Sequence, residues 1–325
     1  MSPAKLLATL ALSLAAAAAA FPVQSQDAWP NRPIRIIHGF GSGGPVDFLA
    51  RLIAPVLSER LGQPVLVEGK AGAGGTLGAA FVAKADPDGY TLLLMAAGHS
   101  AAPGLYKSLP YDAANDFTMI SMLTRAPLAI MAGPSSPAQT VQDLVKLARA
   151  QPGKIDFGSA GTGSGMHLMA VVLQARAGIQ MTHVPYKTAT AANLAVLSGE
   201  IPILFTSVAG ITPLLDSGKV KMIALSSKER YALMPNVPTI AETVLPDFDV
   251  TTWYALAAPK GLPSPIVVKL NEAVHAALKR PDIIDKLRLQ ATEPWPSAPR
   301  AAQDLLSSEV ARWTKVVRDD KIPQQ

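Results

Sequence analysis

The sequence predicts an α/β protein of two units joined by two extended crossings. Strand-like and helix-like segments alternate in the first third of the chain, which indicates a parallel, doubly wound sheet. The same order of strand, glycine-rich loop and helix returns at residues 155–178, and extended apolar runs lie near 124–128 and 250–255. We therefore expect a hinged clamshell, with one domain formed by 26–126 plus 249–325 and the other by 127–248.

The bulk composition fits a globular protein with a proper core. Hydrophobic residues make up 49% of the 325 residues, whereas charged residues make up 16%. The formal net charge of +5 comes from scattered Lys and Arg without a basic run, so we expect no nucleic-acid partner. Cysteine is absent, which excludes disulfides and thiol chemistry.

The first 25 residues have the parts of a secretory signal peptide. Lys5 precedes an apolar stretch at 6–20, which is short for a membrane span, and a small-residue cleavage site follows at 23–25. An N-terminal membrane anchor is the alternative. We expect a signal peptide at 1–25 and a soluble mature protein in a bacterial periplasm.

The elements of the first unit follow from apolar patterning and turn residues. A β-branched strand and a glycine turn precede Pro45, which suits the first position of a helix, and two further strands and one helix follow. We expect strands at 34–40, 64–68 and 90–98, and helices at 46–62 and 76–85.

The remaining elements repeat this alternation and end in helices with amphipathic stripes. We expect strands at 121–134, 155–158, 181–187, 201–208, 220–227 and 248–261, and helices at about 137–151, 165–178, 188–200, 210–219, 265–279, 281–289 and 297–320.

The glycines at 39, 41 and 44 form a literal G-x-G-x-x-G, and Glu68 ends the next strand 24 positions after Gly44. This pattern is typical of a dinucleotide-binding unit. Exported enzymes with such cofactors use a twin-arginine signal, which this sequence lacks. An exported dinucleotide-binding oxidoreductase therefore stays the alternative function.

Two glycine-rich loops, at 41–45 and 159–164, each lie between a strand and a helix. A helix N-terminus offers free N–H groups and favours negative charge. Two such loops facing each other across a cleft would hold an anion with two ends, such as a dicarboxylate. The structural alternative is that both are tight turns that need glycine for positive φ.

Other chemistries have little support in the sequence. The five histidines have no metal-ligand spacing, and the loop before Ser164 is not G-x-S-x-G because residue 162 is Thr. We expect no metal, no cofactor and no catalytic residue. His167 is interpreted as a first-turn residue that faces or caps the loop, and His183 as a structural histidine.

Four further residues have both a binding and a structural interpretation. Tyr186 and Lys187 follow a strand and would lie near the cleft, or form a partly buried ring and a solvated cation. Phe40 would cover the carbon skeleton of a ligand or belong to the core. The Asp47 carboxylate either has a structural role, in which it interacts favourably with the dipole at the first helical turn, or binds an ammonium group of a ligand.

Several motifs resemble one family in order along nearly the whole mature chain. They are "WPNRPIRIIHGFGSGGPVDFLARLI", "LYKSLPYDAANDFTMIS", "KIDFGSAGTGSGMHL", "THVPYK", "LMPNVPTIAE" and "TTWYALAAPKGLPSPIVVKLNEAV". The family is the Bug, or TctC-like, receptors, which are solute-binding proteins of tripartite tricarboxylate transporters. The resemblance implies a type II, Venus-flytrap fold like that of periplasmic binding proteins, with two crossover strands.

The resemblance also implies a small organic carboxylate as ligand, held largely by backbone N–H groups, hydroxyls and bridging waters rather than by Arg. It further implies a loop at 97–100 after the third strand. The implied partners are the transporter's membrane subunits or a sensor kinase, and the protein is expected to be a monomer. The ligand-binding residues carried over by position are Phe40, Gly41, Ser42, Gly43, Gly44, Asp47, Gly98, His99, Ser100, Ser159, Thr162, Gly163, Ser164, His167, Tyr186, Lys187, Thr188, Thr206 and Ser207.

The sequence departs from the family pattern at four of these or neighbouring positions. Gly39 replaces a usual Pro and Gly41 a usual Ala or other small residue, so the G-x-G-x-x-G arises on a different template. Thr206 stands where many members have Asp, which favours purely anionic ligands. Thr188 replaces a usual Gly and adds bulk and a hydroxyl near the cleft.

Overall fold

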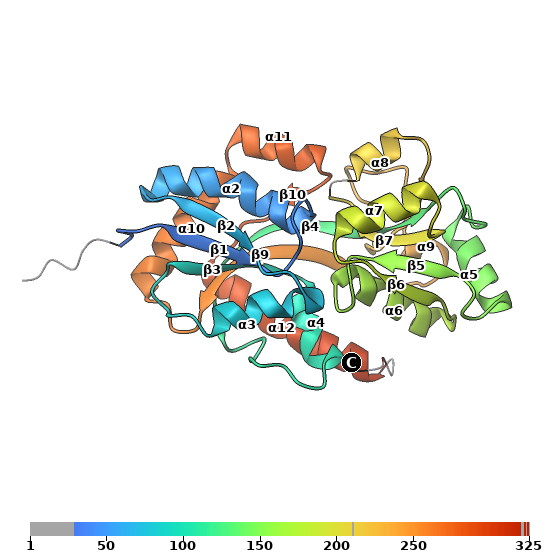
Figure 1. Cartoon of the computed structure of the whole chain (residues 1–325), viewed down its shortest axis with the longest axis horizontal. Helices are drawn as coiled ribbons and strands as arrows, with labels where there is room; N and C mark the ends of the chain where they lie inside the picture. The colour runs from blue at the N-terminus through green and yellow to red at the C-terminus, as the bar shows by residue number, and fades with distance from the viewer. Residues whose placement is uncertain (1–28, 210, 320–321, 323, 325) are drawn as a thin grey trace, which may run out of the picture.

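The computed structural model describes residues 29–209, 211–319, 322 and 324, and it has two lobes joined by two long strands (Figure 1). The predicted signal peptide lies outside the described residues. Within these ranges, no helix combines the length and apolar character needed to cross a membrane. The two-lobed α/β architecture confirms the predicted fold class.

The first lobe has a mixed central sheet. Its strands are β1 (Ile34–His38), β2 (Val65–Gly69), β3 (Thr91–Ala96), β9 (Thr251–Pro259), β4 (Phe117–Ala132) and the short β10 (Glu293–Pro294). The order is β2-β1-β3-β9-β4, and β10 pairs with β4. The first three strands are parallel, whereas β9 runs antiparallel to β3 and β4.

Alternate residues of this sheet enter two different cores, as the pleat of a strand requires. Ile36 and Leu92 pack with α2 (Pro45–Leu61), α10 (Ser264–Leu278) and α11 (Pro281–Leu289). Ile37 and Leu93 pack with α3 (Thr76–Ala83) and the start of α12 (Pro299–Asp319). Because both faces are covered, the strands are apolar at successive positions.

The second lobe has the same layered construction. Its sheet has the order β6-β5-β7-β4, with β8 also paired to β4, where the new strands are β5 (Asp156–Ser159), β6 (Thr182–Pro185), β7 (Ile203–Ser207) and β8 (Lys221–Leu225). One face carries α5 (Val141–Ala150), α6 (Gly165–Ala177) and α9 (Ile240–Thr243). The other carries α7 (Ala189–Ser198) and α8 (Thr212–Asp216).

Two strands cross between the lobes within the predicted segments. β4 pairs with β9 up to Pro127 and with β7 from Leu128 onward. β9 begins at the residue after Val250, and the Val250 amide donates to the carbonyl of Ser226 at 2.9 Å. The helix α12 also reaches both lobes, since its first turns enter one core and its last turns the other. The proposed domain limits stay a prediction.

One predicted loop is instead the start of a helix. We expected a loop at 97–100, but α4 (Gly98–Leu105) begins at Gly98. Pro103 and Gly104 have poor helix propensity, so the sequence shows no helical pattern there. Ala101 and Leu105 are buried in the core shared with α6 and α12, and this packing outweighs the poor propensity.

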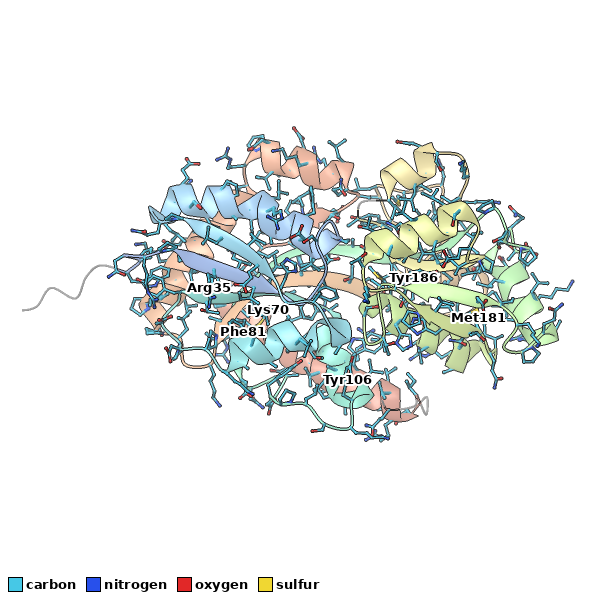
Figure 2. All side chains as sticks on the ribbon, viewed as in Figure 1. Arg35, Lys70, Phe81, Tyr106, Met181 and Tyr186 are labelled. Carbon is cyan, nitrogen blue, oxygen red and sulfur yellow. The ribbon has the colours of Figure 1, made fainter. Side chains whose placement is uncertain are left out.

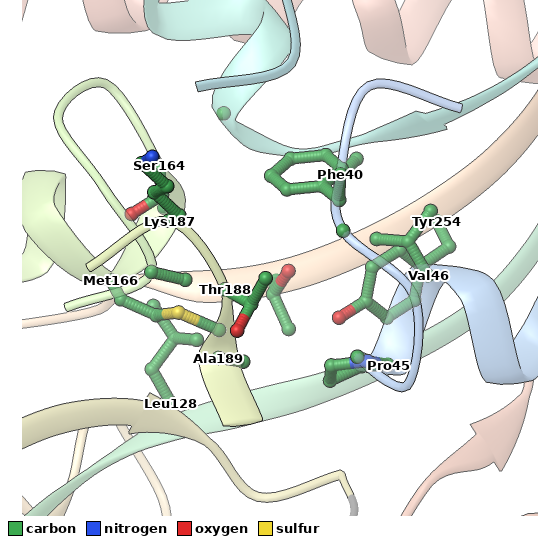
Figure 3. A pocket seen from close by; sticks show the side chains of 17 residues that line it. Phe40, Pro45, Val46, Leu128, Ser164, Met166, Lys187, Thr188, Ala189 and Tyr254 are labelled. Atoms are coloured by element: carbon green, nitrogen blue, oxygen red, sulfur yellow. The ribbon is translucent and has the colours of Figure 1, made fainter. Parts of the chain in front are cut away.

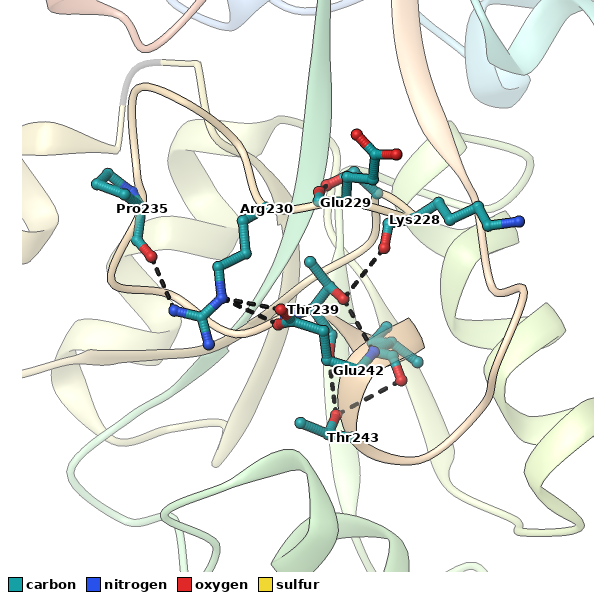
Figure 4. Close-up of polar contacts among 9 residues, drawn as sticks. Lys228, Glu229, Arg230, Pro235, Thr239, Glu242 and Thr243 are labelled. Carbon is teal, nitrogen blue, oxygen red and sulfur yellow. Dashed lines mark hydrogen bonds and ion pairs between the residues drawn. The ribbon is translucent and has the colours of Figure 1, made fainter.

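The segment between β8 and β9 is held by a polar network around α9 (Figure 4). The Thr239 hydroxyl accepts the Glu242 amide at 3.0 Å, and the Glu242 carboxylate accepts the Thr239 amide at 2.9 Å. Arg230 donates to Glu242 and to the carbonyl of Pro235, both at 2.9 Å. The motif "LMPNVPTIAE" therefore shapes the path of the chain.

Candidate functional site

The first turns of three helices meet at one cavity between the lobes (Figure 3). Residues 44–46 come from α2, residues 164–166 from α6, and residues 188–189 from α7. Leu128, Thr252 and Tyr254 line the cavity from the two crossing strands. The gaps between atoms here total about 540 Å³, open solvent included, whereas the cavity volume itself is about 40 Å³.

Several backbone amides at these helix starts have no acceptor within the described part of the protein. The first turn of a helix has no intrahelical acceptors for its N–H groups. Ser164 caps α6 by accepting the His167 amide at 3.3 Å, and Thr188 caps α7 by accepting the Ala191 amide at 3.0 Å. In the described chain, the cavity-lining amides without a protein acceptor include those of Val46, Gly165, Met166 and Ala189.

The electrostatics of the cavity favour an anion. Lys187 is the only charged residue among the described residues that line it. Its side chain is exposed and makes no ion pair within the described ranges. The dipoles of three helix N-termini add partial positive charge on the same space. The cavity therefore suits a ligand with negatively charged ends.

The middle of the cavity is apolar. Phe40 faces it from the first lobe and Met166 from the second (Figure 3). Burial raises the pKa of Tyr254, and hydrogen bonds with Ser207 and Thr252 offset only part of this rise. Tyr254 is therefore a neutral hydroxyl at physiological pH. An apolar middle between N–H donors matches a short carbon chain with charged ends.

Glycines bring the two lobes into direct contact. A Cβ on Gly98 of the first lobe would lie 3.1 Å from the Gly163 carbonyl oxygen of the second. A Cβ on Gly74 would lie 2.7 Å from the Gly163 carbonyl carbon, and Gly74 has a φ of +63°. The cleft is closed in this structure, and these two positions have no room for a side chain.

A second cavity adjoins the first and shares Phe40 and Lys187 with it. Tyr106 of the first lobe also lines it and donates to the Thr162 carbonyl at 3.4 Å. Tyr186 lines it from the second lobe (Figure 2). Burial and the nearby Glu200 raise the pKa of Tyr186 to about 12, so its hydroxyl stays protonated.

The structure brings many of the predicted residues together at these cavities. The first cavity is lined by Phe40, Gly41, Gly44, Gly98, Ser164, Lys187 and Thr188. The second is lined by Thr162 and Tyr186 together with Phe40 and Lys187. Their contact with a ligand stays a prediction.

Asp47 lines neither cavity. Its carboxylate accepts the Gly43 amide and the Arg51 side chain, both at 3.0 Å, and lies 3.2 Å from His38 Nε2. Burial raises the pKa of Asp47, but the hydrogen bonds from Arg51 and Gly43 outweigh burial and hold it below its usual value. Asp47 therefore fixes the shape of the first glycine loop.

His99 and Ser100 line neither of these cavities and instead stabilise the first lobe. His99 Nε2 donates to the Ala113 carbonyl at 2.9 Å, and its ring stacks on Tyr111 at 5.5 Å. Burial lowers the pKa of His99 to about 4. The Ser100 hydroxyl donates to the Ala97 carbonyl at 2.7 Å and so supports the start of α4.

Ser159 and His167 belong to a polar cluster behind the second loop. The rings of His167 and His183 stack at 4.2 Å, and burial lowers the pKa of both to about 4. His167 Nδ1 accepts the Gly163 amide at 3.3 Å, and Ser159 Oγ lies 2.7 Å from His183 Nε2. This cluster holds the loop from within the lobe.

The other predicted residues lie outside the two cavities. Ser42 and Gly43 are exposed, and Gly163 forms the contact between the lobes. Thr206 is buried and pairs with a residue of β4, and the Ser207 hydroxyl accepts the Ala209 amide at 3.1 Å. Residues that the sequence analysis did not single out as ligand-binding also line the first cavity, namely Pro45, Val46, Ala96, Leu128, Ala160, Gly165, Met166, Ala189, Thr252 and Tyr254.

Gly39 of the G-x-G-x-x-G pattern and Glu68 after it are engaged within the protein, whereas Gly41 and Gly44 line the first cavity. A Cβ on Gly39 would lie 2.3 Å from the carbonyl oxygen of Gly75, so glycine is needed at residue 39 for close backbone packing. Glu68 is bound by Lys70 at 2.7 Å and by Arg35 at 3.4 Å. Both cations lie over Phe81 (Figure 2). Glu68 is therefore already paired.

Two hinged α/β lobes that close on a cavity between them define a solute-binding protein. Residues 49–322 match the sequence model of the tripartite tricarboxylate transporter family receptor. BugT of Bordetella pertussis is 34% identical, with 98% of each chain covered. A relative of Agrobacterium vitis, the UPF0065 protein in the TAR-I ttuE-ttuC' intergenic region, is 37% identical over 95% of this chain and 90% of its own.

The chain belongs to this receptor family, as the motifs predicted, and its fold is that of periplasmic binding proteins. The periplasmic binding protein BugD is 33% identical with a TM-score of 0.86, over 91% of this chain and 100% of its own. Rpa4515 of R. palustris, solved with adipate, gives the same values. MatC of Rhodopseudomonas palustris, with bound malate, is 35% identical with a TM-score of 0.85, over 89% and 100%. The dinucleotide alternative finds no support in these relatives.

Proposed function

We propose that this protein captures a small organic carboxylate, such as a dicarboxylate, in the cavity between its lobes. One observation supports this proposal most directly. The first turns of α2, α6 and α7 converge on one cavity that Lys187 borders, and no acidic side chain among the described residues lines it. Relatives with the same fold were solved with adipate and with malate, which are dicarboxylates.

The available interactions are strong enough for this role. Hydrogen bonds to a charged group contribute roughly 1.5–3 kcal/mol each, and a helix N-terminus adds about 0.3–1 kcal/mol. Micromolar binding requires about 8 kcal/mol. Four or five such contacts in a closed cavity would reach this value after the costs of ordering.

The protein would act as a binding protein and leave its ligand unchanged. Its family supports a periplasmic location and a transporter with membrane subunits as partner. The alternative partner is a sensor kinase that recognises the closed form. In both cases the ligand stabilises the closed form, and the partner recognises that form.

A thermal-shift panel tests the proposal. At a ligand concentration about 100 times Kd, binding adds about 2.7 kcal/mol to the free energy of unfolding and raises Tm. Succinate, malate and adipate are the first probes, and NADH tests the oxidoreductase alternative. We expect a shift with at least one acid, none with NADH, and none with any acid in Ser164→Leu. Flat melting of the native protein across a broad panel of acids would refute the ligand class.

A further inference from the structure

Gly41 of the first lobe and Thr188 of the second line the same cavity. Figure 3 shows the Thr188 side chain at this cavity. A Cβ built on Gly41 would lie 2.4 Å from Cγ2 of Thr188 and 3.3 Å from its Cβ. Non-bonded carbon atoms are normally about 3.5–4.0 Å apart. The methyl group of Thr188 therefore occupies the place that a side chain at residue 41 would need.

This contact, and not the backbone, accounts for glycine at residue 41. Gly43 and Gly163 have positive φ values, of +79° and +81°, but Gly41 does not belong to the positive-φ glycines. An alanine at residue 41 would therefore be compatible with the local backbone. What excludes it in the closed cleft is the methyl group on the opposite lobe.

The two ends of the Thr188 side chain have separate roles. Its hydroxyl accepts the Ala191 amide at 3.0 Å and caps α7. Its methyl group faces Gly41. Serine at residue 188 would keep the cap and remove only the methyl group. Alanine at residue 41 would return a methyl group to the same place from the other lobe.

We infer that Gly41 and Thr188 are a size-matched pair that sets how far the cleft closes and where the ligand chain must end. The methyl group fills the gap between the loop at 41–44 and the start of α7, so a ligand cannot extend between them. The pair would favour short, unbranched carboxylates over longer ones. This preference rests on the proposed function, whereas the closing contact does not.

The test uses four proteins: the native chain, Gly41→Ala, Thr188→Ser and the double variant. Titration calorimetry with succinate and adipate measures both affinities. We expect Gly41→Ala to bind both acids at least about tenfold more weakly, because closure is blocked. Thr188→Ser should keep its affinity for succinate and shift the ratio of the two affinities towards adipate by about tenfold, the effect of about one methylene group. The double variant should resemble the native protein.

Small-angle scattering of the four proteins, both ligand-free and with a saturating excess of each acid, measures closure separately from affinity. We expect a larger radius of gyration for Gly41→Ala and recovery in the double variant, which also shows that alanine at residue 41 folds. Equal radii in all four proteins, or a double variant as defective as Gly41→Ala, would overturn the inference. If the native protein binds neither acid but the radii follow the expected order, the pair stands and the proposed preference for short carboxylates fails.

Discussion

The hydroxyl of Tyr106 in the first lobe donates to the carbonyl oxygen of Thr162 in the second, at 3.4 Å. A Cβ on the adjoining Gly163 would lie 2.4 Å from the same hydroxyl, so the ring packs tightly on the loop. This contact spans the cleft beside the cavity and exists only while the lobes are closed. It therefore contributes to the stability of the closed form.

Removing this hydroxyl should weaken ligand binding without changing the first cavity, which Tyr106 does not line. We expect Tyr106→Phe to raise Kd roughly two- to twelvefold, since one neutral hydrogen bond contributes about 0.5–1.5 kcal/mol. The change should lie mainly in the dissociation rate, which stopped-flow fluorescence measures. Tyr106→Ala, which also removes the ring, should have a larger effect. An unchanged Kd in both variants would show that the contact does not stabilise closure.

Lys187 should contribute to affinity in a salt-dependent way. The side chain is exposed at the border of both cavities, so its attraction to a carboxylate is screened by ions. Lys187→Ala should lose several-fold in affinity at low ionic strength and much less at 0.5 M salt. Lys219→Ala, which removes an exposed lysine that lines neither cavity, is the matched control. A loss of equal size in both variants would contradict a specific role.

Stability should fall as the pH drops from 7 towards 4. Burial lowers the pKa of His99, His167 and His183 to about 4 in the folded protein, below the ordinary histidine pKa of 6.5. The unfolded chain therefore takes up protons first, so full stability is present above about pH 6.5 and is lost below it. Each such histidine adds up to about 1.4 kcal/mol per pH unit to the slope.

Urea unfolding at pH 7.5 and 5.0 measures this slope. His167→Gln should reduce the slope of the free energy of unfolding against pH by the contribution of one histidine. Glutamine keeps an acceptor for the Gly163 amide but does not titrate. A native protein with equal stability at both pH values would mean that these histidines are not buried in their neutral form.

A change at the α9 cap should separate stability from binding. Thr239 is buried and caps α9, and it lines neither cavity. Thr239→Ala should lower the free energy of unfolding by about 1 kcal/mol and leave Kd for the ligand unchanged. A large change in Kd would mean that the segment between β8 and β9 influences closure.

The sequence predicted most of the fold because both sheets are buried on two faces. Buried strands such as β3 are apolar at successive positions, and the helices between them have clear stripes. The helix α4 escaped prediction because Pro103 and Gly104 hide it, and only packing of Ala101 and Leu105 explains it. Local propensity carries no information about such tertiary contacts.

Only part of the site could be predicted for a related reason. Glycine loops before helices have a local signature, and Gly41, Gly44 and Ser164 do line the first cavity. Tyr254 escaped notice because an aromatic residue in an apolar strand is normally core. Asp47 has the same sequence context whether it faces a ligand or, as here, pairs with Arg51 and the Gly43 amide.

The most direct test of the account compares an acid with its neutral amide by titration calorimetry. If the helix starts recognise carboxylate charge, succinate, malate or adipate will bind with a micromolar or lower Kd. The corresponding diamide will bind roughly a hundredfold more weakly, because two charged hydrogen-bond sets contribute at least about 3 kcal/mol. Equal affinity for acid and amide, or no binding of any carboxylate, would contradict the account.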